Sequence, residues 1–312
     1  MQKIQQENWI VVIDTLIKPK SILREWRFIS ELLTKNNCIF YEYFINHIQS
    51  YEELIVEIIE EGYTNIMIVG NDTTINKLVN KLFNTKNTVS NGIITLAIIP
   101  VGRKNSFARS YNIDNNIVNA IDIISGWKTV MHDVGLIEYY CDSKPEKLYF
   151  TNLAGVGFYS YLLQRLQNKT KEVGKCRYLY NLFFMLNEYK QVLTKINIDG
   201  KEFNVNLFDM AVCIGKYNWM GIELAYNAIT YDGLFDVTFI SDLTGGKIIK
   251  NISRLYTGSI IKHKNAISLR AKNITIDSTQ PILVEIDGKA LCQSTTIKFS
   301  IIPNSLQVIT GK

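Results

Sequence analysis

Cysteine and proline are scarce in this chain, with five of each among 312 residues. The cysteines stand singly at Cys38, Cys141, Cys176, Cys213 and Cys292. None lies at the short Cys or His spacing of a zinc site, so we expect no zinc and five free thiols, as in a reducing compartment.

Long apolar runs and an apolar N-terminus are also missing. The longest apolar runs, such as Ile93 to Val101, fall short of the roughly 20 residues that a membrane-spanning helix needs. Residues 1–8 are polar and lack the apolar centre of a signal peptide. We therefore expect a cytoplasmic protein whose contact with a membrane, if there is one, is peripheral.

Charge of one sign is in modest excess only, because 34 basic residues stand against 29 acidic ones and give a net charge of +5. This balance suits anionic ligands or an anionic membrane surface and does not by itself indicate nucleic acid, so we expect no nucleic-acid partner. Apolar residues make up 47% of the chain, which excludes a disordered protein, and the length allows two domains.

Apolar and amphipathic segments alternate in the first half of the chain. Short apolar runs predict strands at residues 9–13, 39–44, 65–69 and 93–100, and apolar residues at helical spacing predict helices at 22–34, 51–61 and 73–83. Such alternation is typical of βαβ units with a parallel sheet. We therefore predict an α/β domain at residues 1–127.

The pattern changes near residue 127. Strand-like segments follow at residues 148–153, 192–198, 210–214, 235–240, 266–269, 274–276, 282–286 and 296–302. Asp-Gly pairs, which favour tight turns, separate some of them at Asp199-Gly200, Asp232-Gly233 and Asp287-Gly288. We predict a mostly antiparallel, sandwich-like domain at residues 128–312, interrupted by a helical insertion at about 158–189.

Two glycine-containing loops follow predicted strands at the same end of the parallel sheet. The first is Val69-Gly-Asn-Asp-Thr-Thr-Ile-Asn76, and the second lies within Ile98-Ile-Pro-Val-Gly-Arg-Lys-Asn-Ser-Phe-Ala-Arg109. Each leads into a predicted helix, where backbone N–H groups bind phosphate well. Ligand crevices in such sheets lie beyond the carboxyl ends of the strands. Asp72 or Thr73 is equally suited to an ordinary helix cap, and Arg103 and Lys104 are equally suited to a solvated loop.

Further segments complete an ordered set that runs from about residue 65 to the C-terminus. They are His132-Asp-Val-Gly135, Phe150-Thr-Asn-Leu-Ala-Gly-Val-Gly-Phe158, Ala228-Ile-Thr-Tyr-Asp-Gly-Leu-Phe-Asp-Val237, Tyr256-Thr-Gly258 and Ile286-Asp-Gly-Lys289. With Gly70-Asn-Asp-Thr-Thr74 and Pro100-Val-Gly-Arg-Lys-Asn-Ser-Phe-Ala108, this set resembles the diacylglycerol and sphingosine kinases and the bacterial lipid kinases related to them. Those proteins carry Gly-Gly-Asp-Gly-Thr and Pro-Leu-Gly-Thr-Gly-Asn-Asp-Phe-Ala at the two loops.

The resemblance implies a reaction and a set of site residues. The family transfers the γ-phosphoryl group of ATP to a lipid hydroxyl with Mg²⁺, so ATP and Mg²⁺ are the implied cofactors and a lipid such as diacylglycerol is the implied partner. Asp72, Asp287 and Lys289 match its catalytic positions. Its nucleotide site is matched by Gly70, Asn71, Thr73, Thr74, Gly102, Arg103, Lys104 and Asn105. Asp232, with the carbonyl of Leu234, matches a structural metal position.

The motifs are degenerate at positions that bear on activity. Asn71 and Thr73 replace glycines that let the backbone approach phosphate, and Arg103 and Lys104 replace Thr and Gly in the second loop. Lys289 stands where the family commonly has a glutamate, a proposed general base. An ordinary lysine is protonated at neutral pH and accepts no proton, but it is suited to hold a phosphate or phospholipid head group, or simply to complete a hairpin turn.

Several alternatives therefore stay open. A catalytically impaired pseudokinase that binds nucleotide or phospholipid fits the same motifs, and so does a soluble-substrate kinase related to the NAD kinases. Basic and aromatic residues mixed between Leu163 and Lys195 suit an anionic membrane surface or, equally, an amphipathic helix packed on the second domain. Homodimer formation is left open as well.

Overall fold

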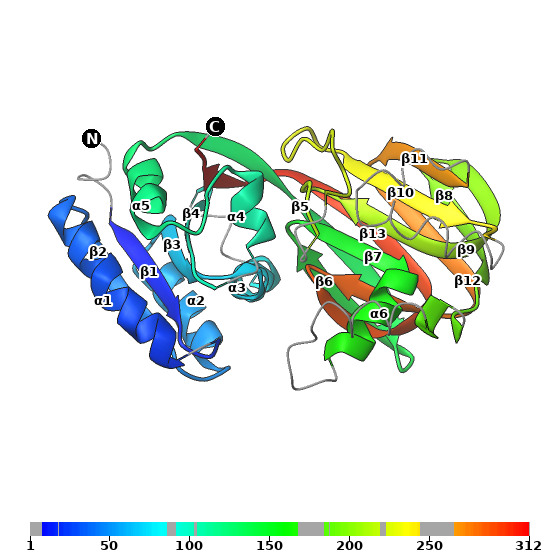
Figure 1. Ribbon diagram of the computed structural model, residues 1–312, viewed down its shortest axis with the longest axis horizontal. Coiled ribbons are helices and arrows are strands. Elements are labelled where there is room, and N and C mark those ends of the chain that lie inside the picture. The colour runs from blue at the N-terminus through cyan, green and yellow to red at the C-terminus, as the bar shows by residue number, and fades with distance from the viewer. Residues whose placement is uncertain are drawn as a thin grey trace.

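The computed structural model describes residues 8–17, 19–85, 92–102, 105–167, 184–186, 188–218, 223–243 and 265–311. Two lobes lie side by side, an α/β lobe that contains the N-terminus and a β-rich lobe, joined by β5 and the end of β13 (Figure 1). The predicted fold class, an α/β domain followed by a β-rich sandwich-like domain, is confirmed.

The α/β lobe is a parallel sheet covered on both faces. Its elements are β1 (Trp9–Asp14), α1 (Pro19–Lys35), β2 (Phe40–Ile45), α2 (Ser50–Glu60), β3 (Asn65–Gly70), α3 (Asp72–Asn84), β4 (Thr95–Pro100), α4 (Ser106–Ser110) and α5 (Ile117–Ser125). The strand order is β4-β3-β1-β2, with every pair parallel. Trp9, Val11 and Ile13 of β1 pack with α1 and α5, whereas Ile10 and Val12 pack with α2 and α3. Alternating side chains thus bury both faces, and they leave the carboxyl edge of the sheet for the two loops.

The β-rich lobe is built from antiparallel pairs, as predicted. Its elements are β5 (Thr129–Cys141), β6 (Lys144–Phe150), β7 (Leu153–Gly157), α6 (Phe158–Gln167), β8 (Val192–Ile198), β9 (Lys201–Cys213), β10 (Phe235–Ser241), β11 (Ala266–Ala271), β12 (Asn273–Ile286) and β13 (Lys289–Ile309). The Asp199-Gly200 and Asp287-Gly288 pairs take positive φ and join β8 to β9 and β12 to β13. Helix α6 begins the predicted helical insertion, of which residues 168–183 and 187 lie outside the described part.

The last strand returns to the first lobe. Gln307 and Val308 of β13 pair in parallel with Thr95 and Leu96 of β4, while the same end of β13 pairs antiparallel with the start of β5. Leu306 and Val308 are buried in the core that α2 and α3 cover. The two lobes therefore share one continuous sheet, which fixes how the loops of the first face the turns of the second.

The expectation of five free thiols is wrong, because Cys141 of β5 and Cys292 of β13 lie on neighbouring strands and form a disulfide, with Cα atoms 5.8 Å apart. Cys38 and Cys213 are free and buried, and Cys176 lies outside the described residues. Among the helices that the structure describes, none has the length and apolar character to cross a bilayer.

Candidate nucleotide and phosphoryl-transfer site

The first loop ends β3 at Gly70 and begins α3 at Asp72. Asn71 caps this helix, since its side-chain oxygen accepts hydrogen bonds from the N–H groups of Thr73 (2.9 Å) and Thr74 (3.4 Å). Its φ of −132° is extended backbone, so the glycine that the family has here is not required for backbone geometry. The cap instead occupies N–H groups that a phosphate would otherwise use.

Gly70 is required by close packing. A Cβ at this position would lie 2.6 Å from Oγ1 of Thr74. Thr74 is fully buried, and its hydroxyl donates to Oδ2 of Asp14 at the end of β1 (2.9 Å), which also accepts from the hydroxyl of Tyr51 (2.7 Å). Thr74 was expected to contact nucleotide, but the structure places it beneath the loop, where it fixes the loop to β1. Thr73 is exposed at the surface of the helix start.

Asp72 links the two predicted loops. Its carboxylate accepts from the backbone N–H groups of Ser106 (2.9 Å) and Phe107 (3.1 Å), which begin α4. Loss of surrounding water raises the pKa of Asp72 to about 7; the two N–H groups oppose the rise, and the negative charge of Asp287 adds to it. A carboxyl with this pKa is present in both forms at neutral pH, which suits proton transfer.

The second loop carries Gly102 and Asn105. Gly102 has φ of +87° with nothing within 4 Å of an added Cβ, so its backbone is open to solvent and needs glycine for conformation alone. The amide of Asn105 donates to the carbonyl of Gly102 (3.2 Å) and to Asn115 (3.2 Å), and these bonds fix the shape of the loop. Arg103 and Lys104, both expected in this site, lie outside the described residues.

Asp287 lies in the turn between β12 and β13, and backbone donors surround its carboxylate. Oδ1 accepts from the N–H groups of Asn152 (2.9 Å) and Leu153 (3.0 Å), and Oδ2 accepts from the N–H of Thr151 (3.0 Å). Desolvation raises the pKa of Asp287, and these donors oppose the rise. The carboxylate therefore orders the loop between β6 and β7, and this arrangement suits a positioning role better than direct contact with a substrate hydroxyl.

Helix α3 connects the two lobes across the junction. Asn76, one helical turn after Asp72, donates to Oδ2 of Asp287 (2.8 Å). Asn80, one turn further, donates to the carbonyl of Tyr149 (2.7 Å) and accepts from its N–H (2.8 Å). The helix that carries Asp72 is thereby fixed to the turn that carries Asp287.

Lys289 follows this turn and is exposed, opposite Ile286 on the paired strand. Further carboxyls lie nearby in the core of the β-rich lobe. Glu285 is fully buried, accepts from the N–H of Gly288 (3.1 Å) and has a pKa raised well above its ordinary value by desolvation. Asp209 accepts from the N–H of Tyr159 (2.9 Å) and has a pKa of about 7, also through desolvation.

The proposed metal position has a different partner in the structure. The carboxylate of Asp232 forms an ion pair with the guanidinium of Arg270, and its Oδ1 accepts from the N–H of Leu234 (3.1 Å). Within the described ranges no group of three or more His, Cys, Asp and Glu residues is placed to hold a metal ion. The residues present do not fit a divalent cation here, because an arginine already neutralises the acid.

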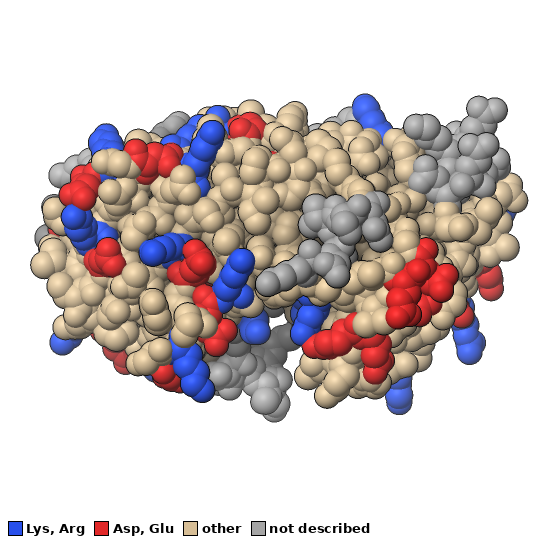
Figure 2. All heavy atoms as spheres, turned by 180° about the vertical axis from the view of Figure 1, so that it is seen from behind, with Lys and Arg blue, Asp and Glu red and all other residues tan. Residues whose placement is uncertain are grey.

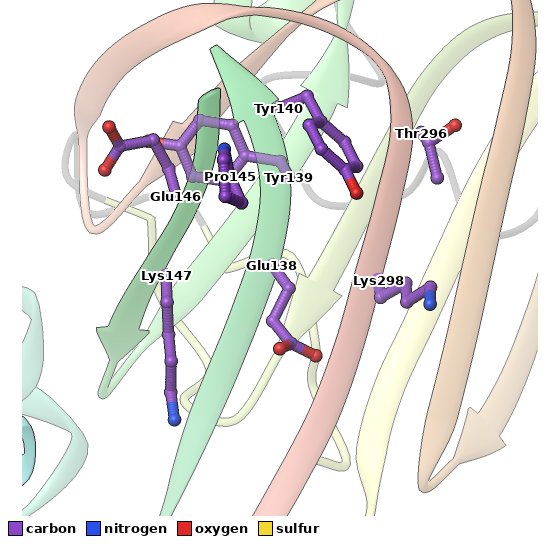
Figure 3. Close-up of a pocket in the computed structure, with 8 residues that line it drawn as sticks. All are labelled: Glu138, Tyr139, Tyr140, Pro145, Glu146, Lys147, Thr296 and Lys298. Carbon is purple, nitrogen blue, oxygen red and sulfur yellow. The ribbon is translucent and has the colours of Figure 1, made fainter. Parts of the chain in front are cut away.

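A surface hollow on the β-rich lobe lies apart from this site. A hollow of about 190 Å³ on β5, β6 and β13 is lined by Glu138, Tyr139, Tyr140, Pro145, Glu146, Lys147, Thr296 and Lys298 (Figure 3). Glu138 pairs in register with Lys147 on one side and Lys298 on the other, so the charges balance and indicate no particular ligand. On the face shown in Figure 2, acidic side chains gather most densely on the α/β lobe, and basic ones are dispersed.

Sequence reasoning missed three residues of this region. Asp14 stands at the carboxyl end of β1, the same sheet edge as the two loops, and that position was a usable signal. Asn76 stood within the first loop motif but was not singled out, because its partner Asp287 is 211 residues away. Arg270 carried no sequence signal for pairing with Asp232.

Two protein-family models match this chain. The model of the diacylglycerol kinase catalytic domain matches residues 9–137, and that of the YegS C-terminal NAD kinase beta sandwich-like domain matches residues 154–310. A diacylglycerol kinase of Staphylococcus aureus (strain bovine RF122 / ET3-1) is 28% identical over 232 residues, which cover 73% of this chain and 69% of that protein.

Solved structures show the same fold. A diacylglycerol kinase from Bacillus anthracis str. Sterne aligns with a TM-score of 0.71 at 18% identity, over 100% of this chain and 98% of that one. Yeast NADH kinase, complexed with NADH, aligns with a TM-score of 0.56 at 10% identity, over 98% of this chain and 84% of that one. The ordered loops, the two-lobe fold and the two domain matches together show that the chain belongs to the diacylglycerol kinase family of the bacterial YegS type.

Proposed function

We propose that this chain is a lipid kinase that uses ATP and Mg²⁺ to phosphorylate a lipid hydroxyl of the diacylglycerol class. The observation that carries the proposal is the connection made by α3, which holds Asp72, at the nucleotide loop, beside the Asp287 turn of the second lobe. A phosphoryl donor on the first lobe and an acceptor against the second would meet at this junction.

The chain's own residues fit a nucleotide at the carboxyl edge of the sheet. Gly102 leaves the second loop open to a phosphate, and Asn105 holds that loop in shape. Mg²⁺ bound with ATP would supply charge neutralisation on the phosphates, and Asp72 offers a carboxylate of the kind that Mg²⁺ prefers. A carboxylate that holds Mg²⁺ stays ionised, so Asp72 would act on the phosphates through the metal rather than as the base for the lipid hydroxyl.

Direct phosphoryl transfer tests this proposal. Protein, γ-labelled ATP and Mg²⁺ would be incubated with diacylglycerol in mixed micelles, and label in the extracted lipid would be counted. We expect lipid labelling that falls at least about 100-fold in Asp72→Asn, as for loss of a group that acts in the transition state. Asp122→Asn, which changes an exposed carboxylate on α5, is the matched control and should retain full activity. Absence of lipid label above a metal-free blank would refute the proposal.

A second candidate is a non-catalytic member that binds nucleotide or phospholipid. Two observations favour it: Asn71 occupies the N–H groups of Thr73 and Thr74, and the exposed Lys289 replaces the family's glutamate. This candidate gives ATP or vesicle binding without lipid labelling. Lys289→Ala should then weaken sedimentation with phosphatidic acid vesicles, whereas Lys298→Ala, an exposed lysine of the same strand, should not. A soluble-substrate kinase would bind ATP and leave vesicles unbound.

A further inference from the structure

Arg270 of β11 lies between two acids, Asp232 just before β10 and Asp236 within β10. Its guanidinium forms an ion pair with Asp232, and its Nε lies 3.9 Å from Oδ2 of Asp236. Asp236 and Arg270 are directly opposite each other in the antiparallel β10–β11 pair, so the strand register itself sets the contact. Oδ2 of Asp236 has no hydrogen-bond donor in the described part of the chain, so the arginine is its only counter-charge there.

Asp232 belongs to a loop that reaches the junction of the two lobes. Asp133 of β5 accepts from the N–H of Gly233 (2.7 Å) and from that of Asn304 (2.7 Å), and its own N–H donates to the carbonyl of Thr230 (2.7 Å). The loop at residues 228–234 is therefore fixed at one side by Asp133 and at the other by the Asp232–Arg270 pair. Loss of either anchor would release a segment that borders β5 and β13.

The guanidinium of Arg270 already takes the place that a bound cation would fill beside Asp232 and Asp236. A divalent cation needs several oxygen ligands around it, and the two available carboxylates already face a guanidinium. Arginine stays charged at every pH at which proteins fold, so it does not leave the acids free for a metal. A second cation in the same place would be repelled by the first.

We propose that Arg270 is a built-in replacement for the structural metal ion that the family resemblance implies at Asp232 and Leu234. The guanidinium neutralises Asp232 and Asp236 and holds the loop at residues 228–234 in place, so the fold needs no metal at this position. Any Mg²⁺ requirement of the protein then belongs to the nucleotide site alone. This inference concerns folding stability and stands whether or not the chain transfers phosphate.

Thermal unfolding of the apo protein, without nucleotide or lipid, gives the test. Wild type, Arg270→Ala and Arg165→Ala would each be melted with EDTA and with millimolar Mg²⁺ or Ca²⁺. Arg165 is the matched control, because it forms an ion pair with Glu188 at nearly the same side-chain exposure, 43% against 42% for Arg270, and pairs with no second acid among the described residues. We expect the Tm of wild type and of Arg165→Ala to be the same in EDTA and in divalent cation.

Arg270→Ala should behave differently. It leaves two carboxylates without a counter-charge, so its Tm in EDTA should fall by roughly 2–4 °C or more, and Mg²⁺ or Ca²⁺ should recover much of the loss. Arg270→Lys, which keeps the charge without the planar fork, should lie between wild type and Arg270→Ala in EDTA. A wild-type Tm that drops in EDTA would overturn the proposal, and so would an Arg270→Ala variant whose Tm is unchanged or indifferent to divalent cations.

Discussion

The side-chain amide of Asn76 donates a 2.8 Å hydrogen bond to Oδ2 of Asp287, across 211 residues of sequence. Asn76 lies one helical turn from Asp72, and Asp287 orders the loop between β6 and β7 through its bonds to the N–H groups of Thr151, Asn152 and Leu153. This hydrogen bond therefore fixes α3, the helix that begins with Asp72, to the turn that carries Asp287 on the second lobe.

Removing that bond should loosen the junction. In Asn76→Ala the partly buried carboxylate of Asp287 loses a donor, so the free energy of unfolding should fall by about 1–3 kcal/mol. Denaturant unfolding measures the change. Asn119→Ala, at an exposed position of α5, is the control and should stay within about 0.5 kcal/mol of wild type. Equal stability of the two variants would contradict a role for Asn76 in joining the lobes.

The raised pKa of Asp72 makes stability depend on pH. Folding raises this pKa from the ordinary value of 3.8 to about 7, so the folded protein holds the proton more tightly than the unfolded chain. The resulting stabilisation is complete below about pH 4 and is lost as the pH rises through about 7.

Asp72→Asn should therefore flatten the decline in unfolding free energy between about pH 4 and pH 8. Asp209, whose pKa is also about 7, contributes a decline of the same sign that remains in the variant. Urea unfolding of both proteins across this range gives the comparison. Identical slopes for wild type and variant would show that Asp72 titrates normally in the folded protein.

The cap made by Asn71 competes with phosphate for backbone N–H groups. Asn71→Gly should release the N–H groups of Thr73 and Thr74 and tighten ATP binding several-fold, while stability changes by only a few tenths of a kcal/mol. Asn116→Gly removes a similar side-chain cap, on α5, and should show the same small stability change with no effect on ATP. Weaker ATP binding in Asn71→Gly would mean that the asparagine itself contacts the nucleotide.

Gly70 and Thr74 should be energetically coupled. Gly70→Ala places a Cβ 2.6 Å from Oγ1 of Thr74, and this overlap should cost about 1–3 kcal/mol. Thr74→Ala removes the contact with Oγ1 along with the hydrogen bond to Asp14 but keeps a Cβ 2.9 Å from the new one, so it relieves part of the overlap and the double variant should be more stable than the sum of the single effects allows. A double-mutant cycle measured by denaturant unfolding provides the coupling energy, and simple additivity would rule out the contact.

Local pattern was enough to predict β1 to β4 and α1 to α3 of the first lobe, whereas α5 was not singled out. Apolar spacing along β1, α2 and β3 follows the burial of these elements closely, because both faces of the sheet are covered by neighbouring helices. Because both glycines follow predicted parallel strands, the sequence also placed Gly70 and Gly102 at the same edge of the sheet. Long-range contacts were beyond such reasoning: β13 pairs with β4 across 212 residues (Gln307 with Thr95), and Cys141 meets Cys292 across 151.

The chemical roles of single residues were harder to predict than their positions. Asn71 was expected to disturb a glycine loop, yet its extended backbone needs no glycine and its effect is through the cap. Asp232 was expected to hold a metal, but Arg270 of β11, 38 residues away, neutralises it. In both cases a motif gives the place of a residue but not its chemistry, which depends on local N–H groups for Asn71 and on an arginine from a distant part of the chain for Asp232.

Calorimetric titration of ATP with Mg²⁺ into wild type and into Asp72→Ala tests the central claim most directly, because a kinase must first bind its donor. Circular dichroism of the variant would confirm that it still folds, since Asp72 also caps α4. We expect metal-dependent binding to wild type that is at least about tenfold weaker in the folded variant. No binding to wild type at millimolar ATP would contradict the claim and leave the protein as a binding module that has lost the donor of its family.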